Sequence, residues 1–409
     1  MNILIINHYA GNPKLGMEYR PFYLAREWVK QGHSVTILGA SYSHLRTLQP
    51  IVNNDFSEDN IEGISYLWLK TPKYKGNIER IMNILVFVFK LIRYANKIAK
   101  KISPDLVIAS STYPLDIIPS KKIAKKSKAK LCFEVHDLWP LSPMVIGGYS
   151  KFHPYICLLQ FAENYAYKHA DIVISLLGNA REYMNKHGLD SNKFVHVPNG
   201  FDREEFEKMQ EDVPYEHFKL ISDLKTDGNI LIGYTGGHGP SNAMNVFVDA
   251  AEMFKDNKRI SFISIGNGPS KTELQTRAKN LNNIFFLPPV PKKSIPKLLS
   301  LFDILYVGFV KSEIHKHGIS PNKLIDYMLA AKPIILSANV KDETVEKCNC
   351  GIVVPAEDLL AVYYAINKFI RMTDIERIEI GDRGKKYAIK EFDYQILADK
   401  FLKKIIETN

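Results

Sequence analysis

The chain has 409 residues, which exceeds what one hydrophobic core usually supports, so we expect two domains. Hydrophobic residues make up 46% of it and charged residues 24%, which is ordinary for a soluble globular protein. No apolar run approaches the roughly 18 residues of a membrane-spanning helix, the run at 3–6 is too short for a signal peptide, and the four cysteines lack zinc-finger spacing. We therefore expect a cytoplasmic protein with reduced thiols and no metal site.

The formal net charge of +10 is concentrated in the first half. Residues 1–205 carry 26 Lys and Arg against 18 Asp and Glu, a difference of +8, and residues 206–409 carry 28 against 26, a difference of +2. Nucleic acid and an anionic membrane surface are both compatible with this charge. We favour the membrane, because aromatic stacking platforms interleaved with Lys and Arg are not evident.

The first elements in chain order are predicted to form a βαβ unit. A strand is predicted at 2–7 and a helix at about 18–31, and a second strand follows at 35–39. In the loop between the first strand and the helix, Gly11 and Gly16 permit close approach of the backbone to a bound group, and Arg20 lies in the first helical turn. A plain strand-to-helix connection is the alternative. Residues 41–77 are predicted to be loops apart from a strand at 64–69.

A long amphipathic helix is predicted at 78–102. Its apolar face comprises Ile81, Ile84, Leu85, Val88, Leu91, Ile92, Ala95 and Ile98. Its other side carries Lys90, Arg93, Lys97 and Lys101, with Phe87, Phe89 and Tyr94 on the flanks. A second basic cluster follows at Lys121, Lys122, Lys125, Lys126, Lys128 and Lys130. Basic amphipathic helices are typical of membrane surfaces, and a solvated face on a core helix is the alternative.

Further strands are predicted at 106–109 and 130–135, and the second of these runs directly into His136. The carboxyl end of a parallel strand lies at the edge of the sheet where ligands bind, and an imidazole titrates near neutral pH. We therefore predict that His136 contacts a sugar hydroxyl or a phosphate. A buried structural histidine is the alternative. A helix at 155–169 and strands at 172–175 and 194–197 complete this half.

The alternation restarts after a weakly patterned segment, 203–227, in which we place the domain linker. A strand at 229–234 leads into Gly236, Gly237 and His238. A strand at 260–265 leads into a second such turn, at Gly266, Asn267 and Gly268. Glycines between a strand and a helix let backbone N–H groups converge on an anion, so both turns are predicted phosphate loops. The remaining predicted strands lie at 284–287, 304–307, 334–336 and 352–354, and the helices at 242–254, 292–301, 356–372 and 375–407.

The richest set of candidate groups lies in the segment 317–333. A helix is predicted to begin near Ser320, with Pro321 in its first turn. Its N-terminus offers unpaired N–H groups, Lys323 adds a full charge, and Asp326 follows on the same side. This arrangement predicts a phosphate-binding site beside a carboxylate that binds hydroxyl groups. An ordinary core helix with a weak Lys323–Asp326 surface pair is the alternative.

These patterns predict an α/β protein with two Rossmann-like, doubly wound parallel-sheet domains facing across a cleft. We place the first domain at 1–205 and the second at 206–389, with a C-terminal helix at about 390–409 that packs back on the first. A crevice between two such domains suits a nucleotide-bearing substrate.

Over nearly its whole length the chain resembles bacterial family 4 glycosyltransferases with the GT-B fold. The resemblance is carried by the opening strand and glycine loop, by segments 134–140, 198–202, 234–237 and 266–269, and by Ser320-Pro321-Asn322-Lys323 leading to Asp326-Tyr327-Met328. The chain is most similar to the N-acetyl-fucosamine transferases of O-antigen and capsule synthesis, to which the segment 74–77 and Arg80 also correspond.

The resemblance implies a retaining, metal-independent, hexosyltransferase-type enzyme without a cofactor. Its donor would be a UDP-sugar, with a GDP-sugar as the second choice, and the sugar could be an N-acetylated deoxyhexosamine. The implied catalytic residues are His136, Lys323 and Asp326. The implied donor-binding residues are Gly11, Gly16, Arg20, Asn199, Gly236, Gly237, His238, Gly266, Asn267, Gly268, Gly318, Ile319, Ser320, Pro321 and Asn322.

The chain departs from this family in two places. The family's donor signature is two glutamates separated by seven residues, and here these positions hold Gly318 and Asp326. Many relatives place an Arg and a Lys in the glycine loop, where this chain has His238 and Asn242. We therefore expect Lys323 to carry more of the diphosphate charge.

The resemblance also implies an acceptor. We expect a polyprenyl-diphosphate-linked saccharide bound by the basic N-terminal domain, at the cytoplasmic face of the inner membrane, with the enzyme in peripheral contact with anionic lipid and with no nucleic-acid partner. The alternatives are a catalytically impaired GT-B scaffold, a GT-B nucleotide-sugar epimerase that releases free sugar, and a phosphorylase, for which no cofactor lysine is identified.

Overall fold

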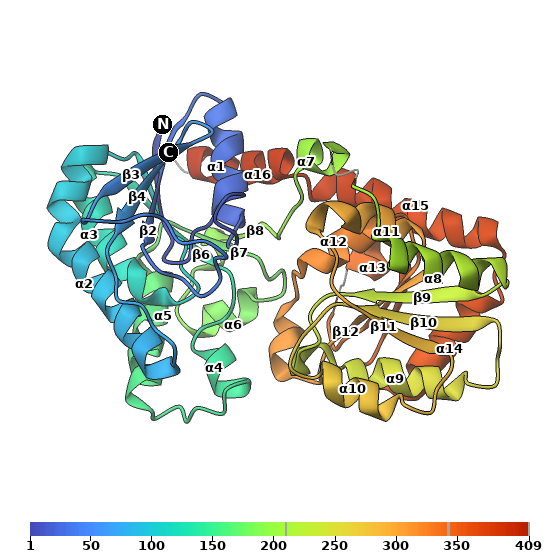
Figure 1. Cartoon of the computed structure of the whole chain (residues 1–409). Coiled ribbons are helices and arrows are strands. Elements are labelled where there is room, and N and C mark those ends of the chain that lie inside the picture. The colour runs from blue at the N-terminus through green and yellow to red at the C-terminus, as the bar shows by residue number, and fades with distance from the viewer. Residues whose placement is uncertain (209–210, 342–343, 408–409) are drawn as a thin grey trace. The chain divides into compact units, whose positions relative to one another are not determined.

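The computed structural model describes residues 1–208, 211–341 and 344–407. The chain divides into two compact units (Figure 1): unit 1 is Met1–Asn199 with Tyr394–Asn409, and unit 2 is Gly200–Asp393. The boundary therefore falls six residues before the predicted one at 205, and the chain returns to unit 1 at Tyr394.

Unit 1 contains an eight-stranded sheet in the order β3-β4-β2-β1-β5-β6-β7-β8. Its strands are β1 (Asn2–Ile6), β2 (Ser34–Ala40), β3 (Ser57–Ile61), β4 (Ile64–Leu69), β5 (Leu106–Ala109), β6 (Lys130–Val135), β7 (Ile172–Ser175) and β8 (Phe194–His196). All pairs are parallel except β3 with β4. β3 was predicted to be a loop, because this exposed edge strand is mostly polar and shows no apolar alternation.

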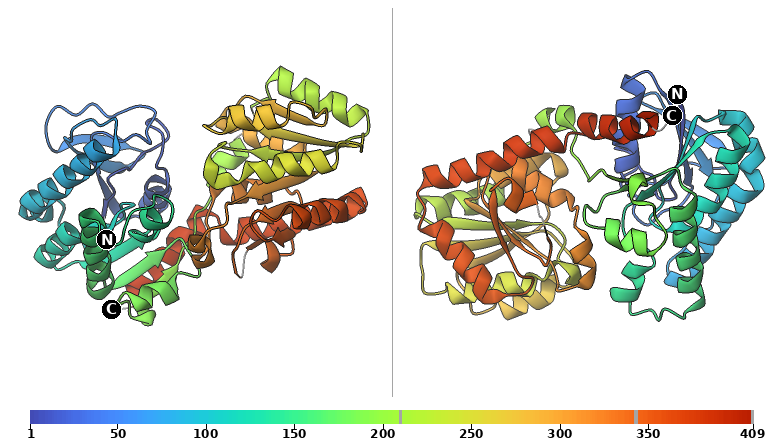
Figure 2. Two further views of the ribbon diagram at one scale, coloured as in Figure 1. Left: turned by 90° about the horizontal axis from the view of Figure 1, so that it is seen from below. Right: turned by 180° about the vertical axis from the view of Figure 1, so that it is seen from behind.

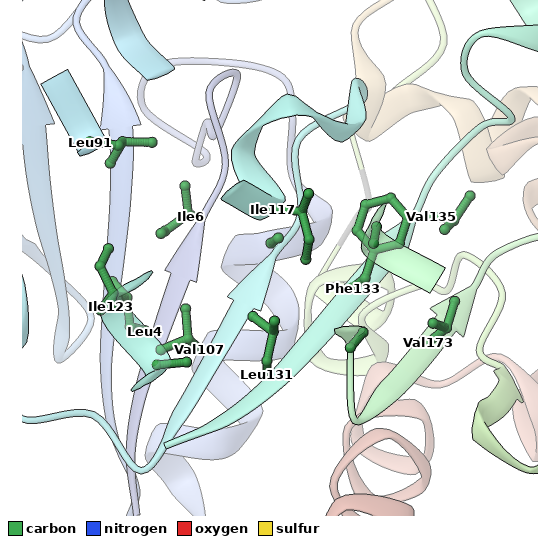
Figure 3. Packing of buried hydrophobic residues seen from close by; sticks show 14 of the residues in the cluster. Leu4, Ile6, Leu91, Val107, Ile117, Ile123, Leu131, Phe133, Val135 and Val173 are labelled. Carbon is green, nitrogen blue, oxygen red and sulfur yellow. The ribbon is translucent and has the colours of Figure 1, made fainter. Parts of the chain in front are cut away.

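Helices cover both faces of this sheet, and β1 shows why. Ile3 and Ile5 pack in one cluster with α1 (Arg20–Lys30) and α16 (Tyr394–Glu407), whereas Leu4 and Ile6 pack in another with α2 (Asn77–Ile102), α3 (Ile117–Ser127) and α5 (Pro154–His169). Successive side chains of a strand point to opposite faces, so a continuous apolar run is typical of a sheet that is buried on both sides. Figure 3 shows the second cluster around Leu4, Ile6 and Val107.

The remaining helical segments of unit 1 are short: α4 (Leu141–Val145), α6 (Arg181–Lys186) and the 3₁₀ turns Pro114–Asp116 and Ser191–Lys193. Helix α2 agrees with its predicted bounds, but two of its residues were assigned to the wrong side of the helix. Leu85 was predicted to be in the core and is exposed, whereas Phe87 was placed on the flank and is fully buried. None of the helices in the described ranges is long and apolar enough to cross a membrane.

Unit 2 contains a parallel six-stranded sheet in the order β11-β10-β9-β12-β13-β14. Its strands are β9 (Ile230–Thr235), β10 (Ile260–Ile265), β11 (Ile284–Leu287), β12 (Ile304–Gly308), β13 (Ile334–Ser337) and β14 (Gly351–Val354). Its helices are α7 (Arg203–Lys208), α8 (Tyr215–Thr226), α9 (Met244–Met253), α10 (Lys271–Arg277), α11 (Ile295–Ser300), α12 (Asn322–Leu329), α13 (Thr344–Lys347), α14 (Leu359–Ile370) and α15 (Asp374–Glu391), with 3₁₀ turns at Pro240–Asn242, Lys292–Ser294 and Glu313–His317.

Helices again cover both faces of the sheet (Figures 1 and 2). α8, α11, α12 and α15 pack in one cluster and α9, α10 and α14 in the other. The segment 203–227 was predicted to be a linker, but α7 and α8 lie within it and Ile221 is buried in the core of unit 2. The described part of α8 buries only His217 and Ile221, which explains its weak pattern. α12 begins at Asn322, two residues later than predicted, and Pro321 precedes it in an extended conformation.

Candidate functional site

The candidate site of unit 2 lies where its strand order reverses. The chain builds the sheet outward from β9 to β11 and then returns to the other side of β9 with β12. In a doubly wound sheet, ligands bind at the carboxyl ends of the strands at such a switch point. The glycine turns after β9 and β10 and the start of α12 come from this edge, and Lys323 of α12 reaches the end of β9.

The two glycine turns are packed backbone against backbone. Gly266 has a φ of +148°, and a Cβ there would lie 1.9 Å from the carbonyl oxygen of Gly236. A Cβ on Gly268 would lie 2.5 Å from the carbonyl oxygen of His238, whose own N–H donates to the Asn267 carbonyl at 2.9 Å. These glycines are therefore needed for contact between the turns, which holds the loop after β9 in place.

The side chain of His238 corrects a prediction. It was predicted to bind the donor, but it is fully buried, and its Nε2 lies 2.6 Å from Ser264 Oγ. Burial, and then the charge of Lys271, lower its pKa, which favours the neutral ring. His238 therefore supports the turn from beneath, and its side chain offers no cation to a phosphate.

Lys323 lies over the loop after β9. Its Nζ donates to Asn242 Oδ1 at 2.8 Å and to Tyr234 Oη at 3.0 Å, and it lies 4.7 Å from the centre of the Tyr234 ring. A Cβ on Gly236 would lie 3.2 Å from the same Nζ. Burial lowers the pKa of Lys323 to about 8, and no carboxylate pairs with it within the described ranges. The ammonium group is thus positioned by neutral partners and lacks a protein counter-ion.

Asp326 and Tyr327 lie one turn further along α12. Tyr327 Oη accepts the Thr235 N–H at 2.7 Å, which ties α12 to the end of β9. The Asp326 carboxylate is half-buried, and burial raises its pKa to about 6, opposed by the charge of Lys292. In the described structure Asp326 forms no ion pair with Lys323, so the alternative of a Lys323–Asp326 surface pair is wrong.

The segment before α12 provides backbone. Gly318 ends the 3₁₀ turn Glu313–His317 with a φ of +105°, and its N–H donates to the His315 carbonyl at 3.0 Å. Ile319 packs against the core of unit 2 and Asn322 is exposed at the first position of α12. The first N–H groups of a helix have no partner within the helix, so Asn322 and Lys323 present backbone donors as well.

A second candidate cluster lies in unit 1, at the carboxyl ends of β5 and β6. His136 Nδ1 lies 3.0 Å from Glu18 Oε1, and its Nε2 lies 3.3 Å from Glu134 Oε2 and 3.1 Å from Ser110 Oγ. Burial alone would lower the pKa of His136, but Glu18 and Glu134 outweigh it and raise the pKa to about 10. The ring is therefore an imidazolium between two carboxylates, and its contact with a ligand stays a prediction.

Arg20 completes this cluster and corrects another prediction. Its Nε donates to Glu134 Oε1 at 2.9 Å, and its remaining nitrogens donate to the carbonyl oxygens of Val197 and Pro198. The side chain is buried, so Arg20 is not open to a phosphate as predicted. Burial would raise the pKa of Glu134, but Arg20 and then His136 lower it to about 2.

In the loop between β1 and α1, the N–H groups of Gly11 and Gly16 form hydrogen bonds within the protein. The Gly11 N–H donates to the Glu18 carbonyl at 2.8 Å, and the Gly16 N–H to the Asn12 carbonyl at 2.9 Å. A Cβ on Gly11 would lie 1.9 Å from the Gly16 carbonyl oxygen, so these glycines permit backbone to approach backbone rather than a ligand. Asn199, which was also predicted to bind the donor, is the last residue of the first segment of unit 1. Its contact with a ligand stays a prediction.

Sequence reasoning missed Glu18, Glu134 and Ser110. Ser110 directly follows β5 and Glu134 lies within β6, so their position at strand ends was the available signal. Glu18 precedes α1 and carried no signal of its own. Only the fold brings these residues to His136.

Solved structures share the whole fold. Sucrose-phosphate synthase from Thermosynechococcus elongatus matches with a TM-score of 0.73 at 13% identity, covering 100% of both chains. The Anabaena protein Alr3699/HepE in complex with UDP matches with a TM-score of 0.68 at 15% identity, again over 100% of both chains. Trehalose-6-phosphate from E. coli, bound with UDP-2-fluoro glucose, matches with a TM-score of 0.70 at 12% identity over 98% of each chain. The two parallel-sheet α/β units therefore form the GT-B fold, as predicted.

Family models match both halves of the chain. Residues 16–205 match Glycosyltransferase Family 4, and residues 229–372 match Glycosyl transferases group 1. No curated protein matches the sequence. The chain therefore carries a Glycosyltransferase Family 4 domain followed by a Glycosyl transferases group 1 domain, within the GT-B fold.

Proposed function

We propose that this protein is a retaining glycosyltransferase that moves a sugar from a nucleotide-diphosphate donor, with the donor diphosphate bound at Lys323. The observation that carries the proposal is the Lys323 ammonium group, which is largely buried, held by Tyr234 and Asn242, and without a carboxylate partner in the described ranges. A buried charge is costly unless it is paired with an opposite charge. Binding of an anion such as a diphosphate would therefore stabilise the Lys323 ammonium group. A metal ion is not required, because the cation and the helix N-terminus neutralise the phosphates.

The transfer step follows from this placement. The bond between the sugar C1 and the diphosphate oxygen breaks, and its electron pair stays on the diphosphate, where Lys323 stabilises the developing charge. The acceptor hydroxyl oxygen forms the new bond to C1 from the same face, and its proton passes to the departing phosphate oxygen. Asp326 would accept hydrogen bonds from the ribose hydroxyls, and His136 would orient the sugar. No cofactor takes part.

UDP is the favoured nucleotide of the donor. The Anabaena protein was solved with UDP and with UDP-glucose, and the E. coli protein with UDP-2-fluoro glucose. A GDP-sugar is the second choice. The sugar is proposed to be an N-acetylated deoxyhexosamine, and the acceptor a polyprenyl-diphosphate-linked saccharide of O-antigen or capsule synthesis at the cytoplasmic face of the inner membrane.

Binding of UDP, GDP and ADP, with chelator present, tests the proposal by calorimetry. We expect one nucleotide to bind, with an affinity that falls about 10- to 100-fold in Lys323→Ala, because a hydrogen bond to a charged group contributes about 1.5–3 kcal/mol. Lys297→Ala, an exposed lysine of the same unit, is the matched control and should bind as the wild type. Equal binding by both variants would contradict the proposal.

An impaired GT-B scaffold is the second candidate, and Gly318 is the observation that favours it. The resemblance to family 4 transferases implies a glutamate at this position, and at the φ of +105° seen for Gly318 a side chain would be strained. A nucleotide-sugar epimerase is a third. Release of UDP from UDP-sugar separates the three: a transferase releases it only with acceptor, an epimerase releases it without acceptor, and a scaffold does not release it.

A further inference from the structure

Three helices of unit 1, α2, α3 and α5, cover the same face of its sheet and share one core cluster. Figures 1 and 2 show them side by side. We call their outward side the α2–α3–α5 face. These helices carry eleven Lys and Arg, and their only Asp or Glu residues are Glu79 and Glu163. Glu163 is buried, and Asp55 and Glu58 pair with Lys90 and Lys101, which leaves nine of the basic residues against Glu79, so the face is basic.

Large apolar side chains project from the same face into water. On α2, Ile78 is 80% exposed and Phe89 is 62% exposed, and Met82 and Leu85 are exposed between them. Their spacing of four, three and four residues places them in one stripe along the helix. Phe152, two residues before the start of α5, is 77% exposed, and Phe161 on α5 is 59% exposed. On their buried sides, α2 and α5 contribute to the same hydrophobic cluster, through Ile84 and Val88 on α2 and Ile156 and Leu159 on α5.

Lysines border these apolar groups. Lys122 Nζ donates to the Ile92 carbonyl of α2 at 3.2 Å, and Lys121 Nζ lies 4.8 Å from the Tyr165 ring of α5, which in turn lies 6.0 Å from the Phe161 ring. Lys151 Nζ lies 5.0 Å from the Phe152 ring. Within the described ranges none of the lysines on α3 pairs with a carboxylate. Exposed apolar side chains and lysines therefore lie close together on this surface, and the α3 lysines lack a carboxylate partner in the described ranges.

We propose that the α2–α3–α5 face docks on an anionic lipid bilayer, with the α2 stripe, Phe152 and Phe161 at the acyl boundary and the lysines at the lipid phosphates. Exposed apolar residues with basic neighbours are the pattern of proteins that lie in a bilayer interface. A second copy of the chain fits this face poorly, because two copies of the same basic surface would repel each other. The inference rests on the proposed function in one respect: a lipid-linked acceptor would be located in the bilayer on which this face docks.

Flotation with vesicles of phosphatidylcholine, with and without phosphatidylglycerol, tests the proposal. We expect the full chain to bind only the anionic vesicles, more weakly at high salt. The variant Phe152→Ser/Phe161→Ser should bind at least about 100-fold more weakly, since each of the two phenyl rings withdrawn from the acyl boundary lowers the affinity by about tenfold or more. The matched control is Leu48→Ser/Ile51→Ser, which removes exposed apolar groups of unit 1 outside the face and should bind normally.

Several outcomes would overturn the proposal: no binding to anionic vesicles, equal loss in the control variant, or a wild-type dimer in solution that only the Phe152→Ser/Phe161→Ser variant dissociates. Tryptophan fluorescence, measured during thermal unfolding of the same preparations, shows that unit 1 of each variant is folded, because all three tryptophans lie in that unit. UDP binding by unit 2 is measured alongside. It separates failure of this proposal from failure of the donor site, because the two measurements use different units of the chain.

Discussion

Lys323 illustrates how a functional group is kept at the expense of stability. The pKa of the buried ammonium group is lowered from 10.5 to about 8, so the folded protein holds this charge less readily than the unfolded chain does. The charged form is therefore destabilising at neutral pH. As pH rises from about 8 towards 10.5, the folded state releases this proton first and the penalty falls.

We predict that Lys323→Met stabilises the ligand-free protein at pH 7 by about 1–3 kcal/mol, because it removes a desolvated charge. The same variant should lose the stabilisation by UDP. Thermal unfolding with and without UDP measures both effects. A fall in the ligand-free midpoint would show that the hydrogen bonds of Lys323 outweigh its desolvation.

Lys323 also predicts the pH dependence of donor binding. The affinity for UDP should fall as pH rises from 7 through about 8, because only the charged ammonium group attracts the diphosphate. Titration calorimetry across this range measures it. In Lys323→Arg the fall should disappear, since a guanidinium group stays charged.

His136 is the opposite case, a charge that the fold stabilises. Its pKa is raised from 6.5 to about 10, so its contribution to stability is fully present below pH 6.5 and is lost as pH rises through about 10. We predict that His136→Gln costs about 2 kcal/mol at pH 7 and much less at pH 10, measured by urea unfolding. Glu18→Gln/His136→Gln removes both charges and should cost less than the single variant. A pH-independent loss would indicate packing instead.

At the scale of the element, the site depends on the turn after β10, which requires glycine at two positions. Gly266 and Gly268 have φ values of +148° and +159°, and both press against the loop after β9. That loop is positioned from the other side by the Tyr327 hydroxyl of α12. Three elements far apart in sequence therefore hold one backbone conformation beneath Lys323.

We predict that Gly266→Ala destabilises the protein by more than about 2 kcal/mol, since the new Cβ would overlap the Gly236 carbonyl. Gly239→Ala, in the same loop, is the matched control. Its nearest contact would be Asn242 Nδ2 at 3.8 Å and its φ is not positive, so it should change stability by less than about 1 kcal/mol. Equal effects of the two substitutions, measured by chemical unfolding, would argue against the interlocked turns.

At the scale of the whole molecule, the last helix belongs to the first unit. α16 packs on α1, where Trp28 Nε1 donates to the Ala398 carbonyl at 3.1 Å and the Trp28 ring lies 5.1 Å from the Phe401 ring. The chain has three tryptophans, Trp28, Trp68 and Trp139, and all lie in unit 1. Tryptophan fluorescence therefore reports on this unit alone.

We predict that truncation before Tyr394 lowers the fluorescence-detected melting temperature by more than about 10 °C, because it exposes the apolar surface under Leu397, Phe401 and Leu402. UDP binding by unit 2 should persist. Asp399→Ala, which removes an exposed contact with Gln31, is the control. An unchanged fluorescence transition after truncation would show that α16 is dispensable for unit 1.

The sequence by itself determined the alternation of strands and helices, the two-unit fold and the phosphate-loop candidates, because apolar runs, glycine turns and Lys323 act locally. Only the tertiary structure decided which candidates are open to a ligand. His238, Arg20 and Gly11 have the right chemistry but are bonded to the protein, whereas Lys323 has no counter-ion among the residues that the structure describes. Hydrogen-bond partners and burial depend on contacts between distant segments, and residue type and spacing do not specify them.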